Sequence, residues 1–189
     1  LYGIYLKETF FDPLGMKNTG VHTSRLIIEN EATGYVINND KFEKSLNWDM
    51  SRAGGAGSLY STVEDLYIWN EAVFNGKVLS DESLKAAFTS VTLNNGKKPV
   101  DMDYGYGWAF WNNRDIRFIG HSGGLHGFLS QLLRQPEEKL TVVVLTNCTP
   151  AQDGKTPGML ADAISEYALW QKMGKQISLS LIHISEPTR

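Results

Sequence analysis

The chain has 189 residues, a hydrophobic content of 42% and a net charge of -3, so it can bury one sizeable core and is predicted to form one domain or most of one. This charge gives no electrostatic case for nucleic acid or an anionic membrane, and no apolar run reaches the length of a membrane span. We therefore expect a small-molecule or peptide partner and neither a cofactor nor a metal, and the single cysteine, Cys148, excludes an internal disulfide.

The first third of the chain contains signals for a helix, a hairpin and a loop. The helix is predicted over residues 1–11, and Pro13 ends it. Its apolar stripe consists of Leu1, Ile4, Tyr5 and Phe11. Residues 33–45 are predicted to form a hairpin around an Asn-Asn-Asp turn, and three glycines between Ser51 and Ser58 predict a loop.

Capping signals predict two helices that together form a helical lobe. Overlapping capping boxes start the first helix, because Ser61 precedes Glu64 and Thr62 precedes Asp65 by three residues. The Asn75-Gly76 pair stops it. Ser80 caps the second helix.

The remainder of the chain predicts an antiparallel meander followed by a helix. Large residues alternate with small ones from Tyr104 to Phe110, which indicates a strand. Further strands are expected through Phe118, around 128–133 and over 140–146, with turns at 112–115 and 136–139. Thr156 caps the last helix, with Pro157 at its first position and a stop at Gly174. The expected buried stripe is Leu160, Ala163, Ile164, Tyr167 and Ala168.

The last residues have the character of a non-native tail. Residues 179–189, LSLIHISEPTR, show neither helical nor strand periodicity and resemble the translation of a sequencing adapter read in frame. We therefore predict that residues 1–178 make up the domain and that His183 has no part in the chemistry.

Gly120, Ser122 and Gly124 spell G-x-S-x-G, which is the nucleophile elbow of α/β-hydrolases. An elbow needs a helix directly after the serine, and the glycines that follow Ser122 make a poor helix. The only later histidines are His126, which is too close in sequence, and His183. Ser122 would then lack the general base that an unassisted hydroxyl requires, so this alternative is disfavoured.

Several segments in order resemble the serine beta-lactamase-like family, which includes penicillin-binding proteins, class C beta-lactamases and related esterases. The similar segments are FFDPLGMKNTG (10–20), AGSLYSTVEDLYIW (56–69), YGYGW (104–108), GHSGGLHGF (120–128) and VVVLTN (142–147). The resemblance covers about residues 1–174. It implies an α+β fold of the beta-lactamase/transpeptidase type, with an antiparallel sheet flanked by helices and a helical lobe, incomplete at the N-terminus.

The resemblance also implies roles for the residues around His121. In this family a strand beside the active site carries Lys-Thr-Gly or His-x-Gly, which matches His121-Ser122-Gly123 here. His121 is thus the catalytic candidate, orienting the catalytic tyrosine or holding the acyl group, and Ser122, Gly123 and Gly124 are substrate-binding candidates. The N–H of Gly124 would donate to the oxyanion. For His126 we predict only a surface role.

The family's nucleophile is absent from this chain. No serine has lysine three residues later and no tyrosine has asparagine two residues later, and in the family both motifs precede the PLGM segment. We therefore expect the C-terminal part of a serine hydrolase that acts on esters, peptides or beta-lactams, inactive by itself. Histidine in place of lysine gives no permanent charge for a substrate carboxylate, which favours esterase or peptidase activity. A non-catalytic relative that binds peptides or cell wall is the alternative, and the resemblance implies a periplasmic or secreted location.

Overall fold

A computed structural model of the chain describes residues 1–189 except 24–25, 47, 99–102, 114–115 and 174–189. The predicted tail over 179–189, its His183 and the predicted helix stop at Gly174 lie outside the described residues. The turn predicted over 112–115 is described only in its first half, because residues 114–115 are among those left out.

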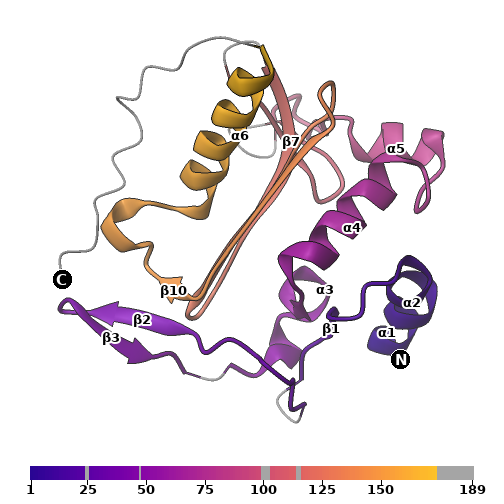
Figure 1. The fold of residues 1–189 in the computed structure, drawn as a ribbon. Helices are drawn as coiled ribbons and strands as arrows, with labels where there is room; N and C mark the ends of the chain where they lie inside the picture. The colour runs from indigo at the N-terminus through magenta and orange to yellow at the C-terminus, as the bar shows by residue number, and fades with distance from the viewer. Residues whose placement is uncertain (24–25, 47, 99–102, 114–115, 174–189) are drawn as a thin grey trace.

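A five-stranded antiparallel sheet forms the centre of the fold, in the order β5-β6-β7-β8-β9 (Figure 1). Its strands are β5 (Asp103–Tyr104), β6 (Ala109–Asn113), β7 (Ile116–Leu125), β8 (Phe128–Gln135) and β9 (Leu140–Thr146). Neighbours in the sheet are neighbours in the chain, so the predicted meander is confirmed.

Helices pack on both faces of this sheet. Phe118, Leu133 and Val142 lie on three adjacent strands and form the core with Ala161 and Leu169 of α6 (Pro157–Met173). The next residues along β8 and β9 point to the opposite face, because side chains alternate along a strand. There α4 (Val63–Phe74) contacts β9. Figure 1 shows the sheet between α6 and α4, and the predicted α+β architecture is confirmed.

The predicted capping signals mark real helix ends. Thr62 is the N-cap of α4 and accepts a hydrogen bond from the Asp65 N–H at 3.3 Å, whereas Asn75 is its C-cap. Ser80 caps α5 (Asp81–Ala87) and accepts from the Ser83 N–H at 3.2 Å. These bonds satisfy backbone donors that the first turn of a helix leaves free.

Two small sheets surround the central one. β2 (Tyr35–Asn38) and β3 (Lys41–Lys44) form the predicted hairpin, with Asn39 and Asp40 at positive φ in its turn. β10 (Cys148–Thr149) runs parallel to β2. β1 (Gly20–Val21) pairs with β4 (Leu59–Tyr60).

The N-terminal helix differs from the prediction at its end and at its packed face. It comprises α1 (Tyr2–Leu6), the π-helical turn η1 (Lys7–Phe11) and α2 (Asp12–Leu14). Pro13 does not end it, because proline in the first turn of α2 needs no backbone donor. The end is Gly15, at a φ of 78°. Of the predicted stripe only Phe11 is buried, while Leu1, Ile4 and Tyr5 are exposed.

The loop predicted over 51–58 is wrong, because the chain forms two short helical turns there. These are η2 (Met50–Arg52) and α3 (Gly54–Gly57). The backbone N–H and the hydroxyl of Ser58 both donate to the carbonyl of Gly54, at 3.2 and 2.6 Å. These two bonds close a helical turn that glycine content alone disfavours.

The strand predicted from Tyr104 to Phe110 is two short strands with a turn between them. The N–H of Gly105 donates to the Trp108 carbonyl at 2.8 Å, and Gly107 has a φ of 75°. The alternation of large and small residues therefore reflected a Gly-rich turn between β5 and β6, which glycine's freedom at positive φ permits.

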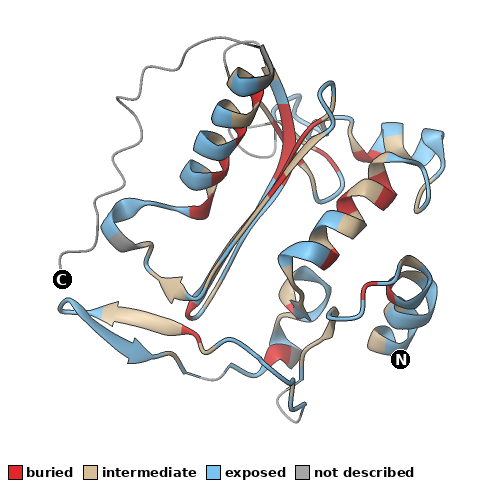
Figure 2. Ribbon diagram, viewed as in Figure 1, coloured by how far each residue is buried: buried red, intermediate tan, exposed pale blue. Residues whose placement is uncertain are grey.

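The buried face of α6 is not the predicted one. Thr156 caps the helix as expected and accepts from the Met159 N–H at 3.2 Å. The residues packed on the sheet are Pro157, Ala161, Ser165 and Leu169. Leu160, Ala163, Ile164 and Tyr167 are exposed and Ala168 is half-buried (Figure 2). The short 3-10 turn η3 (Gln152–Gly154) precedes this helix.

Candidate active site

The predicted site residues all lie on the part of β7 where the sheet has a free edge. The last pair between β6 and β7 is Ala109 with Gly120. From His121 to Leu125 the only neighbouring strand among the described residues is β8. A strand with one open side presents backbone groups and side chains that a ligand can reach.

The hairpin at the end of β7 fixes which backbone groups face that open edge. Leu125 and Phe128 pair across a two-residue turn, so they exchange both ladder hydrogen bonds. Hydrogen bonding alternates along an antiparallel strand, which turns the N–H and C=O of Gly124 and of Ser122 away from β8. The Gly124 N–H thus points to the open side of β7, as a donor to an oxyanion bound at this edge would.

Gly123 meets a tight contact on the other side of the strand. A Cβ built on Gly123 would lie 2.5 Å from the Ser130 hydroxyl oxygen, on the opposite strand β8. A side chain at position 123 would therefore force the Ser130 hydroxyl to move. At Gly124 a Cβ would come only to 3.4 Å from Leu129.

His121 is exposed, and both of its ring nitrogens are hydrogen-bonded within the chain. Nδ1 lies 2.6 Å from the carbonyl oxygen of Ser122, and Nε2 lies 2.8 Å from the hydroxyl of Tyr104. The Tyr104 and His121 rings meet edge to face, with centroids 5.7 Å apart. Sequence reasoning missed Tyr104 as a site residue, although it begins the YGYGW segment that supported the resemblance.

The G-x-S-x-G alternative is contradicted by the strand itself. Ser122 lies inside β7, which continues to Leu125, so no helix follows the serine. Within the described part of the chain, no histidine or carboxylate side chain bonds the Ser122 hydroxyl. Ser122 lacks both the elbow and the base that a nucleophilic serine requires.

The tip of the β7–β8 hairpin contacts β10 and the segment that follows β3. The His126 ring lies 4.9 Å from the Trp48 ring, and the Ser45 hydroxyl donates to the His126 carbonyl at 3.3 Å. The Gly127 N–H donates to the Thr149 hydroxyl at 3.1 Å. The exposed His126 therefore takes part in holding the turn that ends the free edge of β7.

Among the described residues, two carboxyl groups have shifted pKa values. Asp103 precedes Tyr104, and hydrogen bonds from Lys98 and then Ser90 lower its pKa below the ordinary value. Burial on α6 and, to a smaller extent, the charge of Glu166 raise the pKa of Asp162. Neither group bonds His121. In the described residues, no group of three histidine, cysteine or acidic side chains could hold a metal ion, and no helix is long and apolar enough to cross a membrane.

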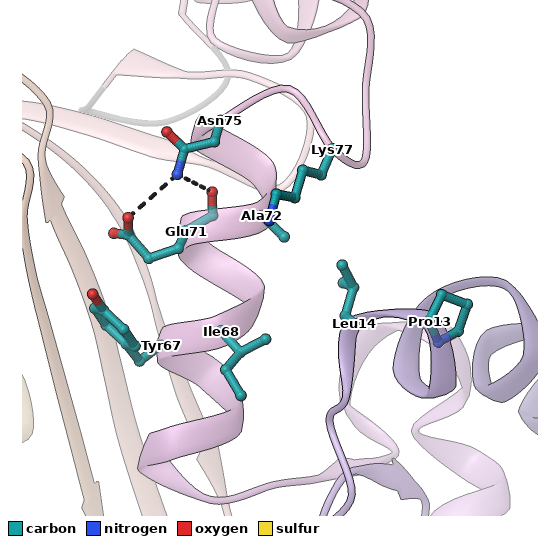
Figure 3. A pocket seen from close by; sticks show the side chains of 8 residues that line it. All are labelled: Pro13, Leu14, Tyr67, Ile68, Glu71, Ala72, Asn75 and Lys77. Atoms are coloured by element: carbon teal, nitrogen blue, oxygen red, sulfur yellow. Dashed lines mark hydrogen bonds between the residues drawn. The ribbon is translucent and has the colours of Figure 1, made fainter.

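A groove of about 270 Å³ lies between α2 and α4, away from β7 (Figure 3). Its walls include Pro13, Leu14 and Tyr67. Its Asn75 amide is already bonded, because it donates to the carbonyl of Glu71 at 2.7 Å and to the Glu71 carboxylate at 3.3 Å. None of the residues that line it belongs to the predicted site.

Comparison with known proteins agrees with this fold. The Beta-lactamase family model matches residues 2–165. Penicillin-binding protein 4* of Bacillus subtilis (strain 168) is 31% identical over an alignment of 160 residues that covers 77% of this chain and 35% of that protein.

Two solved structures share the fold. The octameric penicillin-binding protein homologue from Pyrococcus abyssi has a TM-score of 0.69 at 24% identity, over 93% of this chain and 38% of its own. The D-amino acid amidase from Ochrobactrum anthropi SV3, complexed with L-phenylalanine amide, has a TM-score of 0.69 at 24% identity, over 92% of this chain and 51% of its own. The chain thus spans about a third of penicillin-binding protein 4* and about half of the amidase. It belongs to the beta-lactamase and penicillin-binding-protein family of serine hydrolases.

Proposed function

We propose that this chain is the C-terminal part of a serine hydrolase that cleaves esters, amides or peptides through an acyl-enzyme. The nucleophile is supplied by residues outside these 189. The observation that carries the proposal is the free edge of β7, where the Gly124 N–H faces away from β8 beside His121. The matched relatives include a penicillin-binding protein and an amidase, which supports this reaction class.

In the proposed reaction the serine oxygen adds to the substrate carbonyl carbon, and the carbonyl oxygen becomes an oxyanion. The Gly124 N–H donates a hydrogen bond to that oxygen, and one such donor contributes about 100- to 1000-fold in rate. Collapse of the adduct breaks the bond to the alcohol or amine, which leaves with a proton. Water then hydrolyses the acyl-serine and restores the hydroxyl.

The surroundings of His121 favour a substrate without a carboxylate at this position. Both ring nitrogens are bonded to chain atoms, one to Tyr104 and one to Ser122. A carboxylate would therefore have to displace one of these bonds, whereas a lysine ammonium has three donors to share. We accordingly place ester, amide or peptide hydrolysis ahead of beta-lactam hydrolysis.

The test uses the longer protein that contains this chain and its nucleophile. His121→Ala should lower kcat/KM for a p-nitrophenyl ester about tenfold or more, because a hydrogen-bonding contact worth about 1.5 kcal/mol corresponds to about tenfold in rate. His22→Ala is the control, because it also removes a hydrogen-bonded histidine, one whose Nε2 lies 2.9 Å from the Glu31 carboxylate and which is not on the site strand; it should leave kcat/KM within about twofold. Equal effects of the two variants would remove His121 from the site.

The 189-residue chain alone should turn over neither nitrocefin nor the ester. Turnover that survives purification and disappears in Ser122→Ala would refute a nucleophile outside the chain. A longer protein that carries no Ser-x-x-Lys and shows no turnover would instead be a non-catalytic binding relative.

A further inference from the structure

We propose that Tyr104 is a positioning residue that acts with the Ser122 carbonyl to fix which nitrogen of His121 carries the proton. Its hydroxyl oxygen lies 2.8 Å from Nε2, and the two residues are 17 apart in the chain. On the other side of the ring, Nδ1 lies 2.6 Å from the Ser122 carbonyl oxygen. The imidazole is thus a link between a phenol and a backbone carbonyl.

The chemistry of these two partners determines the tautomer. A carbonyl oxygen can only accept, so Nδ1 must carry the proton in the bond to Ser122. The neutral ring then offers Nε2 as an acceptor, and the hydroxyl of Tyr104 donates to it. The carbonyl requires the Nδ1–H tautomer, and the phenol hydroxyl, which is a stronger donor than acceptor, favours it further.

Tyr104 is itself held in place by its backbone. It pairs with Ala109 in the β5–β6 ladder, and its carbonyl accepts from the Val91 N–H at 2.8 Å. The following residue, Gly105, approaches the Ala87 carbonyl so closely that a Cβ would lie 2.1 Å from that oxygen. The hydroxyl is therefore presented from a constrained position.

The hydrogen-bond chain from Tyr104 through His121 ends on the Ser122 carbonyl, at the open edge of the strand. The Ser122 C=O points to the same side as the Gly124 N–H, and its partial negative charge would oppose an oxyanion there. The Nδ1–H of His121 caps this oxygen, which leaves the N–H groups to set the local potential. This role in catalysis rests on the proposed function, whereas the tautomer itself does not.

The test is 15N NMR of the histidine rings in the 189-residue chain. A protonated and an unprotonated ring nitrogen have widely separated shifts, so the tautomer of each histidine can be assigned. His121 should carry its proton on Nδ1. His22 is an internal contrast, because its Nε2 lies 2.9 Å from the Glu31 carboxylate and must donate to it.

Tyr104→Phe keeps the ring and removes the hydroxyl. The ratio of Nε2–H to Nδ1–H tautomer at His121 should rise about two- to tenfold, which is the effect of one lost hydrogen bond. Tyr106→Phe is the matched control, since Tyr106 lies two residues further on, in the turn after β5, and is 70% exposed. It should leave the ratio unchanged.

Two results would overturn the proposal. One is an unmutated chain in which His121 is mainly the Nε2–H tautomer, a measurement that remains decisive even if Tyr104→Phe does not fold. The other is a folded Tyr104→Phe chain with an unchanged ratio. Neither result involves substrate, so failure here and failure of the hydrolase assay are distinguishable.

Discussion

Removing the carboxylate of Glu71 should strongly destabilise the chain, because it leaves a buried cation without its partner. Arg134 on β8 is 2% exposed and bonds the carboxylate of Glu71 on α4. Its guanidinium also donates to the Thr141 hydroxyl at 2.6 Å and lies 5.2 Å from the centre of the Phe74 ring. Breaking a buried pair in this way costs about 3–5 kcal/mol. The Glu71 side chain is 29% exposed, so we expect the lower end, about 3 kcal/mol, for Glu71→Ala.

Urea unfolding followed by circular dichroism measures this loss. With an m-value of about 2–3 kcal/mol/M, a loss of about 3 kcal/mol lowers the midpoint by about 1–1.5 M. The double variant Glu71→Leu with Arg134→Met removes both charges and should recover most of the stability. Lys7→Ala breaks the exposed pair with Asp12 and should change stability by less than about 0.5 kcal/mol. A cost below about 1 kcal/mol for Glu71→Ala would show that solvent screens the Arg134 charge.

Three further predictions concern the site strand, the last helix and the sheet edge. Gly123→Ala should lower the free energy of unfolding in urea by about 1–3 kcal/mol, because the new Cβ would meet the Ser130 hydroxyl. Adding Ser130→Ala should restore stability, since the Ser130 Cβ lies 3.8 Å from the new Cβ. If stability does not recover, this contact is not the cause. Asp162→Asn should raise the melting temperature at pH 7. The raised pKa means that Asp162 favours the fold when protonated and loses this contribution as pH rises above the ordinary value of 3.8, so the two chains should converge in acid. β9 pairs only with β8 among the described residues, so the chain should associate with rising concentration, and Leu145→Lys should reduce this in sedimentation velocity; a chain that is monomeric at all concentrations would contradict the idea.

The sequence predicted helix ends better than it predicted helix faces. Thr62, Ser80 and Thr156 each bond a backbone N–H three residues ahead, and such local bonds depend only on neighbouring residues. The buried face of α6 depends instead on what lies against it. Ala161 and Ser165 are fully buried. Their small side chains let the helix approach the sheet closely. The apolar periodicity of the sequence therefore selected the wrong face.

The candidate site shows the same division between local and distant causes. The resemblance located the His121 strand, and the free edge there follows from where β6 begins, at Ala109. The partner of His121 could not be found by spacing, because Tyr104 lies on another strand and was assigned to a continuous alternation through Phe110. A turn at Gly107 breaks that alternation. β6 therefore starts only after this turn and leaves His121 without a strand opposite on that side, while the Tyr104 hydroxyl bonds its ring. Gly105 and Gly107, which made the strand prediction wrong, thus help to create both the open edge and the contact that orients His121.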